Sequence, residues 1–215
     1  RPGWQPPIDP LVLDLDNDDV ELVSLAESNA EFDIDADGEA EHVAWVDADD
    51  GLLAIDWNGD GIINDINELF GNFAVDGFTE LAQLDSNGDG VIDAQDELFD
   101  QLKVWQDSDG DGTSDDGELS SLTDAGIASI NLDATEISET VAGQDVTHQS
   151  TFTRTDGSIG NAYDVQFHNE SIISEGDWNI TGLEYMDLAN GETDYVALSL
   201  DDVMETELST LVING

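Results

Sequence analysis

The stretch Asp107–Glu118 reads DSDGDGTSDDGE and places oxygen-bearing side chains at regular intervals. It matches the EF-hand calcium loop, D-x-[DN]-x-[DN]-G-x5-E, at every defined position, with Gly112 in sixth place. Ca²⁺ prefers six to eight oxygen ligands, and alternate short carboxylates let one tight loop supply several of them. The predicted ligands are Asp107, Asp109, Asp111, Thr113, Asp115 and Glu118. Thr113 is expected to bind through its main-chain carbonyl. A solvated acidic turn is the simpler interpretation, but the complete pattern favours calcium.

Two further stretches keep both the alternate acceptors and the glycine in sixth place. The first follows Leu52–Ile55, an apolar segment typical of a buried strand, and closes at its thirteenth position instead of its twelfth. Its predicted ligands are Asp56, Asn58, Asp60, Ile62 and Glu68. The second closes at its twelfth position, and its predicted ligands are Asp85, Asn87, Asp89, Val91, Asp93 and Asp96.

Two earlier stretches match the pattern less fully, and both calcium binding and a polar turn remain open for them. The first has alternate acids but Asp19 where glycine is expected, and its acids are Asp14, Asp16 and Asp18. The second has Gly38 in place, and its acids are Asp33, Asp35 and Asp37. The acids before Gly51 are further ligands or a polar turn, and they are Asp47, Asp49 and Asp50. The sequence therefore predicts Ca²⁺ as the cofactor, with three strong sites and up to about five in all.

Short segments with strand or helix patterns separate these loops. Alternating or continuous apolar residues predict strands at 11–13, 20–25, 42–46, 52–55, 103–106 and 127–132 and a hairpin over 150–167 that turns at Asp156-Gly157. Helical spacing around the Asp85 loop predicts a helix–loop–helix from 78–84 and 94–102, and a further exit helix at 118–125. Only the ten residues Glu97–Gln106 separate the last two loops, too few for an EF-hand pair. The expected fold class is α+β: strands and β-hairpins tipped with calcium loops, a few short helices including EF-hand-like units, and a β-rich C-terminal part.

The charge of the chain is extreme. It has 52 Asp and Glu against 3 Lys and Arg, a formal net charge of −49, and self-repulsion of this size destabilises a compact state unless cations offset it. Such a surface argues against nucleic acid as a partner and against an anionic membrane. No apolar run approaches the roughly 20 residues of a membrane helix, and no cysteine is present to form a disulfide. Bound calcium and adaptation to a salty medium both fit the acidity.

Other residues give weaker signals. The three histidines, His42, His148 and His168, lack the mutual spacing of a zinc site, and we interpret them as ordinary strand residues. Trp45 and Trp105 stand in apolar segments and are expected in the core, whereas Trp57 is expected to be exposed.

The dipeptide Asp9-Pro10 has distinctive chemistry. The Asp carboxylate can attack its own main-chain carbonyl and form a cyclic anhydride, and the prolyl nitrogen leaves once it is protonated. Proline has no N–H, so the competing succinimide route through that nitrogen is closed. An Asp-Pro pair alone is also typical of a turn before a strand.

Three runs give this dipeptide its context: IDPLVLDLD at 8–16, FDIDADGEAEHVAWVDADDGLLAIDWNGDGIINDINELFG at 32–71, and LAQLDSNGDGVIDAQDELFDQLKVWQDSDGDGTSDDGELSSLTDAGIASINL at 81–132. In this order they resemble the self-processing module of FrpC-like RTX (repeats-in-toxin) proteins, over roughly Asp9–Asn169. The resemblance implies that the Asp9–Pro10 bond is cut when calcium binds, leaving Pro10 as a new N-terminus. It also implies that the released aspartyl end can be transferred to a lysine amine.

The sequence departs from that family at two points. The family usually has glycine where this chain has Asn17 and Asp19, which predicts a weaker first site and slow or lost processing. Lys103 is the only lysine, so a lysine-bearing acceptor is expected to be another protein.

These patterns predict three regions: a linker upstream of the scissile bond at 1–9, the calcium-binding module at 10–170, and a β-rich extension or next adhesin domain at 171–215. The chain does not begin with Met, and we expect it to be a piece of a longer protein, secreted or on the surface of a bacterium. The expected function is single-turnover, calcium-triggered self-cleavage in an RTX adhesin or toxin. The alternative is a structural calcium-binding adhesin segment that keeps the bond intact; a dockerin-like module fits less well. No nucleic acid and no membrane insertion are expected, and the oligomeric state is open.

Overall fold

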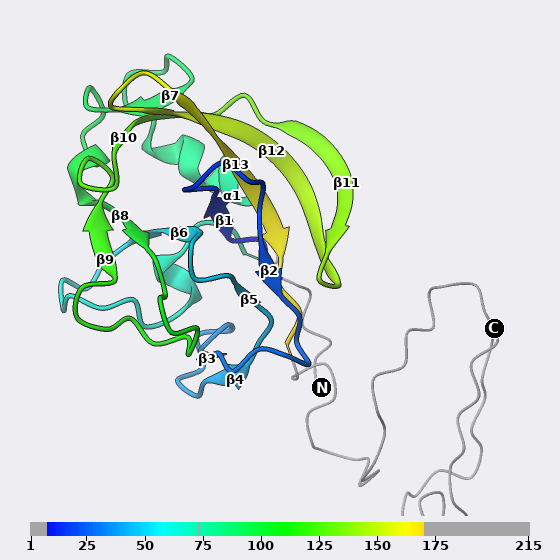
Figure 1. Ribbon diagram of the computed structural model, residues 1–215. Coiled ribbons are helices and arrows are strands. Elements are labelled where there is room, and N and C mark those ends of the chain that lie inside the picture. The colour runs from blue at the N-terminus through cyan, green and yellow to red at the C-terminus, as the bar shows by residue number, and fades with distance from the viewer. Residues whose placement is uncertain (1–7, 73, 170–215) are drawn as a thin grey trace, which may run out of the picture. The chain divides into compact units, whose positions relative to one another are not determined.

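Strands joined by acidic loops make up most of the structure, a computed structural model that describes residues 8–72 and 74–169 (Figure 1). The predicted extension at 171–215 and most of the predicted linker lie outside these residues. No helix of the described part is long and apolar enough to cross a membrane.

One nine-stranded antiparallel sheet organises this part of the chain. Its centre is β1 (Leu11–Leu13), which lies between β13 (Ile159–Gln166) and β6 (Gly51–Ile55). Beyond β13 follow β12 (Gln144–Arg154), β10 (Ile127–Asn131) and β7 (Val91–Asp93), and β11 (Thr135–Val141) also pairs with β12. Beyond β6 follow β8 (Leu102–Trp105) and β9 (Leu119–Ser121). Two small sheets pair β2 (Leu22–Val23) with β5 (Trp45–Val46) and β3 (Glu31–Phe32) with β4 (Glu41–His42).

The central strand is short but completely buried, because apolar side chains cover both faces of the sheet. All three residues of β1 have 0% exposure. Val12 belongs to the cluster on one face, and Leu11 and Leu13 belong to the cluster on the other. The continuous apolar runs of β1 and β6 are what a strand buried on both faces requires.

An aromatic cluster fills the first face. Trp45 contacts Phe32, Trp105 and Phe167, with ring centroids 5.4–5.5 Å apart. Trp45 and Trp105 are buried, as their apolar surroundings predicted, and Trp57 is 53% exposed, also as predicted.

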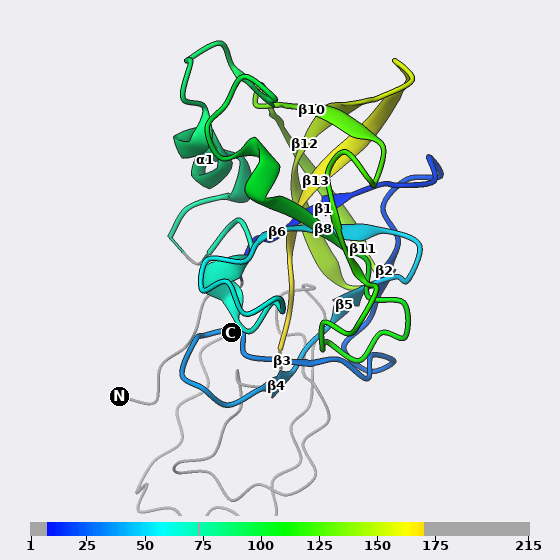
Figure 2. The ribbon, with the colours of Figure 1, turned by 90° about the vertical axis from the view of Figure 1, so that its left-hand side faces the viewer.

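The second face is covered by the helix α1 (Gly77–Leu81), which Figure 2 shows on one side of the sheet. Phe78 and Leu81 of α1 are buried in the same cluster as Leu11, Leu13 and Leu53. Asp76 caps the helix, since its side chain accepts a hydrogen bond from the Thr79 N–H at 2.9 Å.

The expected α+β class with EF-hand-like units is wrong, because the described residues are mostly β. They contain one α-helix, α1, and three 3₁₀ turns at Ile66–Glu68, Ala82–Leu84 and Phe99–Gln101. The predicted helix at 94–102 consists of turns and the first residue of β8, and the one at 118–125 begins as β9. Isolated helices this short are marginal in water. The first segment instead forms turns with main-chain bonds to the third residue back, such as Phe99 to Asp96, and in the second, β9 pairs with β8.

The predicted hairpin is confirmed, with Gly157 at a φ of +85° in the turn between β12 and β13. The sequence did not reveal β11 or the first half of β12. Their turn, Ala142-Gly143, has positive φ at both residues, as a two-residue hairpin turn requires. Most of β11 is exposed, so it carries no apolar alternation to detect.

Substitution of Leu53 by Ala tests the importance of the central strands. Leu53 has 0% exposure, and its truncation is expected to lower the free energy of unfolding by about 2–5 kcal/mol in urea unfolding. Ile159→Ala is the control, because Ile159 is 56% exposed and its loss is expected to cost about 0.5 kcal/mol or less. Equal losses for the two variants would contradict this description of the core.

Candidate functional site

The Asp9-Pro10 peptide leads directly into the central strand. The main-chain carbonyl of Pro10 accepts a hydrogen bond from Val165 of β13, and that of Ile8 accepts one from Phe167, the residue after β13, both at 3.1 Å. The Leu11 N–H donates to the Phe70 carbonyl at 3.1 Å. Pro10 is buried and Asp9 is half-buried. The bond is therefore held on both sides by the sheet and by the segment before α1.

Gly71 lies against the carbonyl group of this peptide. A Cβ atom at Gly71 would stand 1.8 Å from the Asp9 carbonyl oxygen and 2.5 Å from its carbon, so a side chain cannot be accommodated without movement. The Gly71 φ of +109° also favours glycine. Its N–H donates to Oε2 of Glu80 at 2.9 Å, which fixes the segment in place.

The Asp9 carboxyl group has a raised pKa and an oxygen without a hydrogen-bond partner in the described residues. Its pKa is raised to about 6, mainly by burial; a hydrogen bond with Gln166 and the charge of His148 lower the pKa, and the charge of Asp76 adds to the rise. Its Oδ1 atom is buried and has no hydrogen-bond partner within the described structure. An oxygen without a partner retains its lone pairs for attack on a carbonyl carbon.

A second buried carboxyl group, Asp164 of β13, lies close by. Its Oδ2 accepts a hydrogen bond from the Gly77 N–H at 2.9 Å and lies 3.9 Å from Nδ1 of His148, while its Oδ1 has no partner among the described residues. Burial raises the pKa of Asp164 to about 8, and the charge of Asp9 adds to the shift. Sequence reasoning missed Asp164 and treated His148 as an ordinary strand residue; an acid inside the apolar run of β13 was the available signal.

The three strong acidic loops share one hydrogen-bonding scheme. In each, the first carboxylate accepts main-chain N–H bonds from the fourth and sixth residues, and the closing carboxylate accepts them from the second and ninth, all at 2.7–3.1 Å. The first and closing carboxylates are Asp56 and Glu68, Asp85 and Asp96, and Asp107 and Glu118. Glu68 closes its loop in this way although it is one residue late. The three loops therefore share one pattern of main-chain hydrogen bonds, without the pair of flanking α-helices of an EF-hand.

The loop at Asp107–Glu118 is joined to the aromatic core. Nε1 of Trp45 donates to Oδ2 of Asp107 at 2.7 Å, and Nε1 of Trp105 lies 3.4 Å from Oε2 of Glu118. A Cβ at Gly112 would lie 2.6 Å from the Glu31 carbonyl oxygen, so the loop packs directly on β3. Although burial raises the pKa of Glu118, hydrogen bonds from Asp115 and Ser108 lower it below its usual range.

Carboxylate oxygens converge in several loops. Groups of three, with their oxygens within 4.8 Å of one another, are Asp107, Asp109 and Glu118; Asp109, Asp111 and Asp115; and Asp33, Asp35 and Asp37. The charge of Asp111 raises the pKa of Asp109, which shows the repulsion that such a group carries. These are hard oxygen donors, so the residues fit Ca²⁺. At Asn58 and Asn87 an amide oxygen takes the third position, and those two loops do not form such acidic triplets.

The first loop is completed from a distant segment. Asp14 and Asp16 come together with Asp50, within 4.8 Å, instead of with Asp18. Asp50 is buried, accepts hydrogen bonds from the Leu15 and Glu21 N–H groups, and has its pKa raised to about 7 by burial. Of the acids before Gly51, Asp50 is therefore the one whose carboxylate joins this group.

The two residues that replace glycine in the first loop adopt its backbone conformation. Asn17 and Asp19 have φ values of 69° and 76°, which Asn and Asp tolerate better than other residues. Arg154, one of the 3 basic residues of the chain, donates to the Asp14 carbonyl at 3.1 Å and to Oδ1 of Asn17 at 3.2 Å. A cation thus supports the loop from β12.

Gly71→Ala tests the close approach to the Asp9 carbonyl. The new Cβ must displace the Asp9-Pro10 peptide, and such overpacking costs about 1–3 kcal/mol beyond the strain of a positive φ. Gly157→Ala is the matched control, since Gly157 has a φ of +85° but nothing within 4 Å of the added Cβ. Urea unfolding is expected to show the larger loss for Gly71→Ala, and equal losses would count against the contact.

Asp50→Asn tests the first loop. Removing a carboxylate from the group is expected to raise, at least about threefold, the calcium concentration at the midpoint of the tryptophan fluorescence change. Asp49→Asn is the control, because Asp49 is the exposed neighbour and lies outside the group. If the two variants have the same midpoint as the unsubstituted chain, Asp50 is not a ligand.

Comparison with known proteins identifies the family of this chain. A family profile described as the SPM domain matches residues 11–168. The iron-regulated protein FrpA of Neisseria meningitidis serogroup C is 41% identical over 184 residues, which are 81% of this chain and 16% of that protein. The chain thus spans about a sixth of that relative's length. It belongs to the SPM family, the self-processing modules of FrpC-like RTX proteins.

Proposed function

We propose that this module cleaves its own Asp9–Pro10 bond when calcium binds, through an aspartyl anhydride, within a bacterial RTX protein that is secreted or displayed on the cell surface. The observation that carries this proposal is the placement of the bond. It enters the central strand, Gly71 packs on its carbonyl, and the Asp9 carboxyl group has an oxygen without a partner in the described residues.

The chain's own residues supply the reaction. The ionised Asp9 carboxylate attacks the Asp9 carbonyl carbon and closes a five-membered anhydride, and the bond to the Pro10 nitrogen breaks. The sheet contacts at Ile8 and Pro10 hold the two ends of this peptide, so fewer orientations compete with the reactive one. Water then opens the anhydride and leaves Asp9 as a new C-terminus.

Calcium would be held by the acidic loops described above, with Asp50 added to the first. Its chemistry there is charge neutralisation, which offsets carboxylate repulsion and allows the compact state to form. Because a preformed site rarely exists in an unfolded chain, binding free energy becomes folding free energy. Extracellular calcium modules typically bind at about 10⁻⁴–10⁻³ M, so export from a cell would trigger folding and then cleavage.

The first loop is the one best placed to affect the scissile bond. Asp14 directly follows β1, and Asp50 directly precedes β6, the strand that pairs with β1 through Val12 and Leu13. A cation between these carboxylates would draw the two strand ends together. The central strand, and with it the Asp9-Pro10 peptide, would then gain its fixed position.

The anhydride is also an acyl donor for amines. We propose that a lysine-bearing protein acts as the acceptor, because Lys103 is the only lysine of the chain and is half-buried in β8. The alternative function is a structural calcium-binding segment of an adhesin that leaves the bond intact. Asn17 and Asp19, where the family usually has glycine, favour that alternative if the first loop no longer binds calcium.

Intact mass spectrometry tests the proposal. The chain is purified with chelator, millimolar calcium is added, and a fragment that begins at Pro10 is expected to accumulate within hours. Asp9→Ala is expected to yield no fragment while showing the same calcium-induced fluorescence change.

Magnesium or sodium chloride in place of calcium is the control for charge screening, and neither is expected to release the fragment. An unchanged mass after a day in calcium, with the folded signal present, would reject self-cleavage and leave the structural alternative.

A further inference from the structure

The face of the sheet that carries the Asp9 side chain also carries Asp164. In the register of β1 and β13, Leu11 faces Asp164, and the bridge from Ile8 to Phe167 continues this pairing past Asp9. Residues two apart in an extended segment project to the same face, so Asp164 is the diagonal cross-strand neighbour of Asp9. After burial, the charge of Asp9 is the largest cause of the raised pKa of Asp164, as this proximity of the two carboxyl groups requires.

The environment of Asp164 favours its protonated form. The residue has 0% exposure, and its Oδ1 has no hydrogen-bond partner in the described part of the chain. A buried, incompletely hydrogen-bonded carboxyl group with a like charge nearby keeps its proton. With a pKa of about 8 for Asp164 and about 6 for Asp9, the first is mostly protonated and the second mostly ionised at pH 7. Two carboxyl groups whose environments separate their pKa values in this way can act as acid and nucleophile.

The other titratable groups around Asp164 are less suited to donate a proton to this bond. His148 lies 3.9 Å from Asp164 but on β12, which β13 separates from β1. Asp76 is partly desolvated, yet hydrogen bonds from Thr79 lower its pKa, so it is ionised at pH 7. Tyr163 faces the opposite side of the sheet and burial raises its pKa to about 12.

We propose that Asp164 is the acid that protonates the Pro10 nitrogen as the Asp9–Pro10 bond breaks, an inference that rests on the proposed function. The Asp9 carboxylate forms a new C–O bond to its own carbonyl carbon, and the C–N bond breaks. Its electron pair stays on the Pro10 nitrogen, which takes the proton of Asp164. The products are the anhydride, the free amine of Pro10 and the Asp164 carboxylate.

His148 links this acid to solvent. Its side chain is 30% exposed, and its Nδ1 lies near both Asp164 and the Thr147 hydroxyl. Opening of the anhydride by water releases a proton, and the His148 ring offers a route by which a proton returns to Asp164.

Asp164→Asn is the first test, because the amide removes the proton donor but keeps an oxygen for the Gly77 N–H. Cleavage in saturating calcium at pH 7, followed by intact mass, is expected to slow at least about a hundredfold. Asp100→Asn, the same change at an exposed site in the Phe99–Gln101 turn, is the control and is expected to stay within about twofold of the unsubstituted chain. Tryptophan fluorescence checks that both variants fold.

The pH profile of the unsubstituted chain is the second test and needs no variant. The rate requires Asp9 ionised and Asp164 protonated, so it is expected to fall below about pH 6 and above about pH 8. Asp164→Glu is expected to recover part of the cleavage rate and to retain the fall in rate at alkaline pH. Asp164→Asn is expected to lose that fall.

The possible results distinguish failure of the proposed role of Asp164 from failure of the proposed self-cleavage. If the unsubstituted chain cleaves but Asp164→Asn cleaves equally fast with the same alkaline fall, the role of Asp164 is overturned and self-cleavage stands. If the rate stays constant from pH 7 to pH 9, Asp164 is likewise not the acid. If the unsubstituted chain releases no fragment in calcium, the proposed function fails and this inference fails with it.

Discussion

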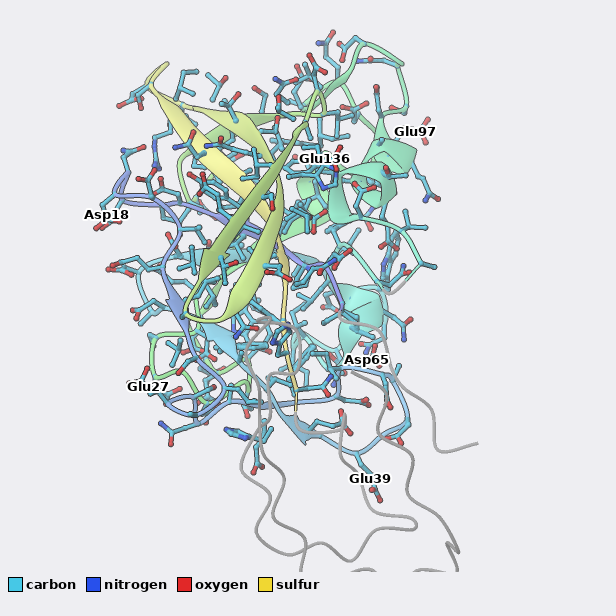
Figure 3. All side chains as sticks on the ribbon, turned by 90° about the vertical axis from the view of Figure 1, so that its right-hand side faces the viewer. Asp18, Glu27, Glu39, Asp65, Glu97 and Glu136 are labelled. Atoms are coloured by element: carbon cyan, nitrogen blue, oxygen red, sulfur yellow. The ribbon has the colours of Figure 1, made fainter. Side chains whose placement is uncertain are left out.

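Repulsion between carboxylates limits how this chain can fold and pack. With 52 acidic residues and 3 basic ones, no arrangement of salt bridges can neutralise the chain. The acids are not gathered in one patch: Figure 3 shows Asp18, Glu27, Glu39, Asp65 and Glu97 spread around the module, with Glu136 on β11. The fold instead places its buried carboxylates against main-chain N–H groups and tryptophan rings. Those hydrogen bonds offset part of the cost of burial, and we propose that a cation bound by the converging loop oxygens offsets the remainder.

The acidic loops are connected through the core to the Asp9–Pro10 peptide. The Asp107 loop is bonded to Trp45 in the core, and the first loop lies where β1 ends and β6 begins. A change in charge at either loop therefore acts on the packing around the central strand. Carboxylate repulsion also acts between Asp9 and Asp164, because two neighbouring buried carboxyl groups cannot both be ionised at low cost. We propose that neutralisation of the loop carboxylates controls folding, and that the protonation states of Asp9 and Asp164 control cleavage of the Asp9–Pro10 bond.

Much of this arrangement could be predicted from local sequence signals, and the rest depended on contacts distant in the chain. The loop positions followed from spacing alone, and even the late Glu68 closes its loop as expected. The helices at 94–102 and 118–125 were predicted wrongly, because the first segment forms turns and strand pairing of β9 outweighed a weak helical pattern in the second. Asp164, His148 and Asp50 reach their sites through strand register, which a single sequence does not encode locally. The proposed role of Asp9 came from the chemistry of an Asp-Pro bond and a family resemblance, whereas the proposed role of Asp164 required the pairing of β1 with β13.

We propose that calcium-dependent folding creates the cleavage site. The decisive experiment is a calcium titration of one sample in which tryptophan fluorescence and the initial rate of appearance of the Pro10 fragment are recorded at each concentration. Because Trp45 and Trp105 report the core that supports β1, the two curves are expected to share one midpoint. Cleavage that reaches its full rate while the fluorescence is still that of the calcium-free chain would contradict it.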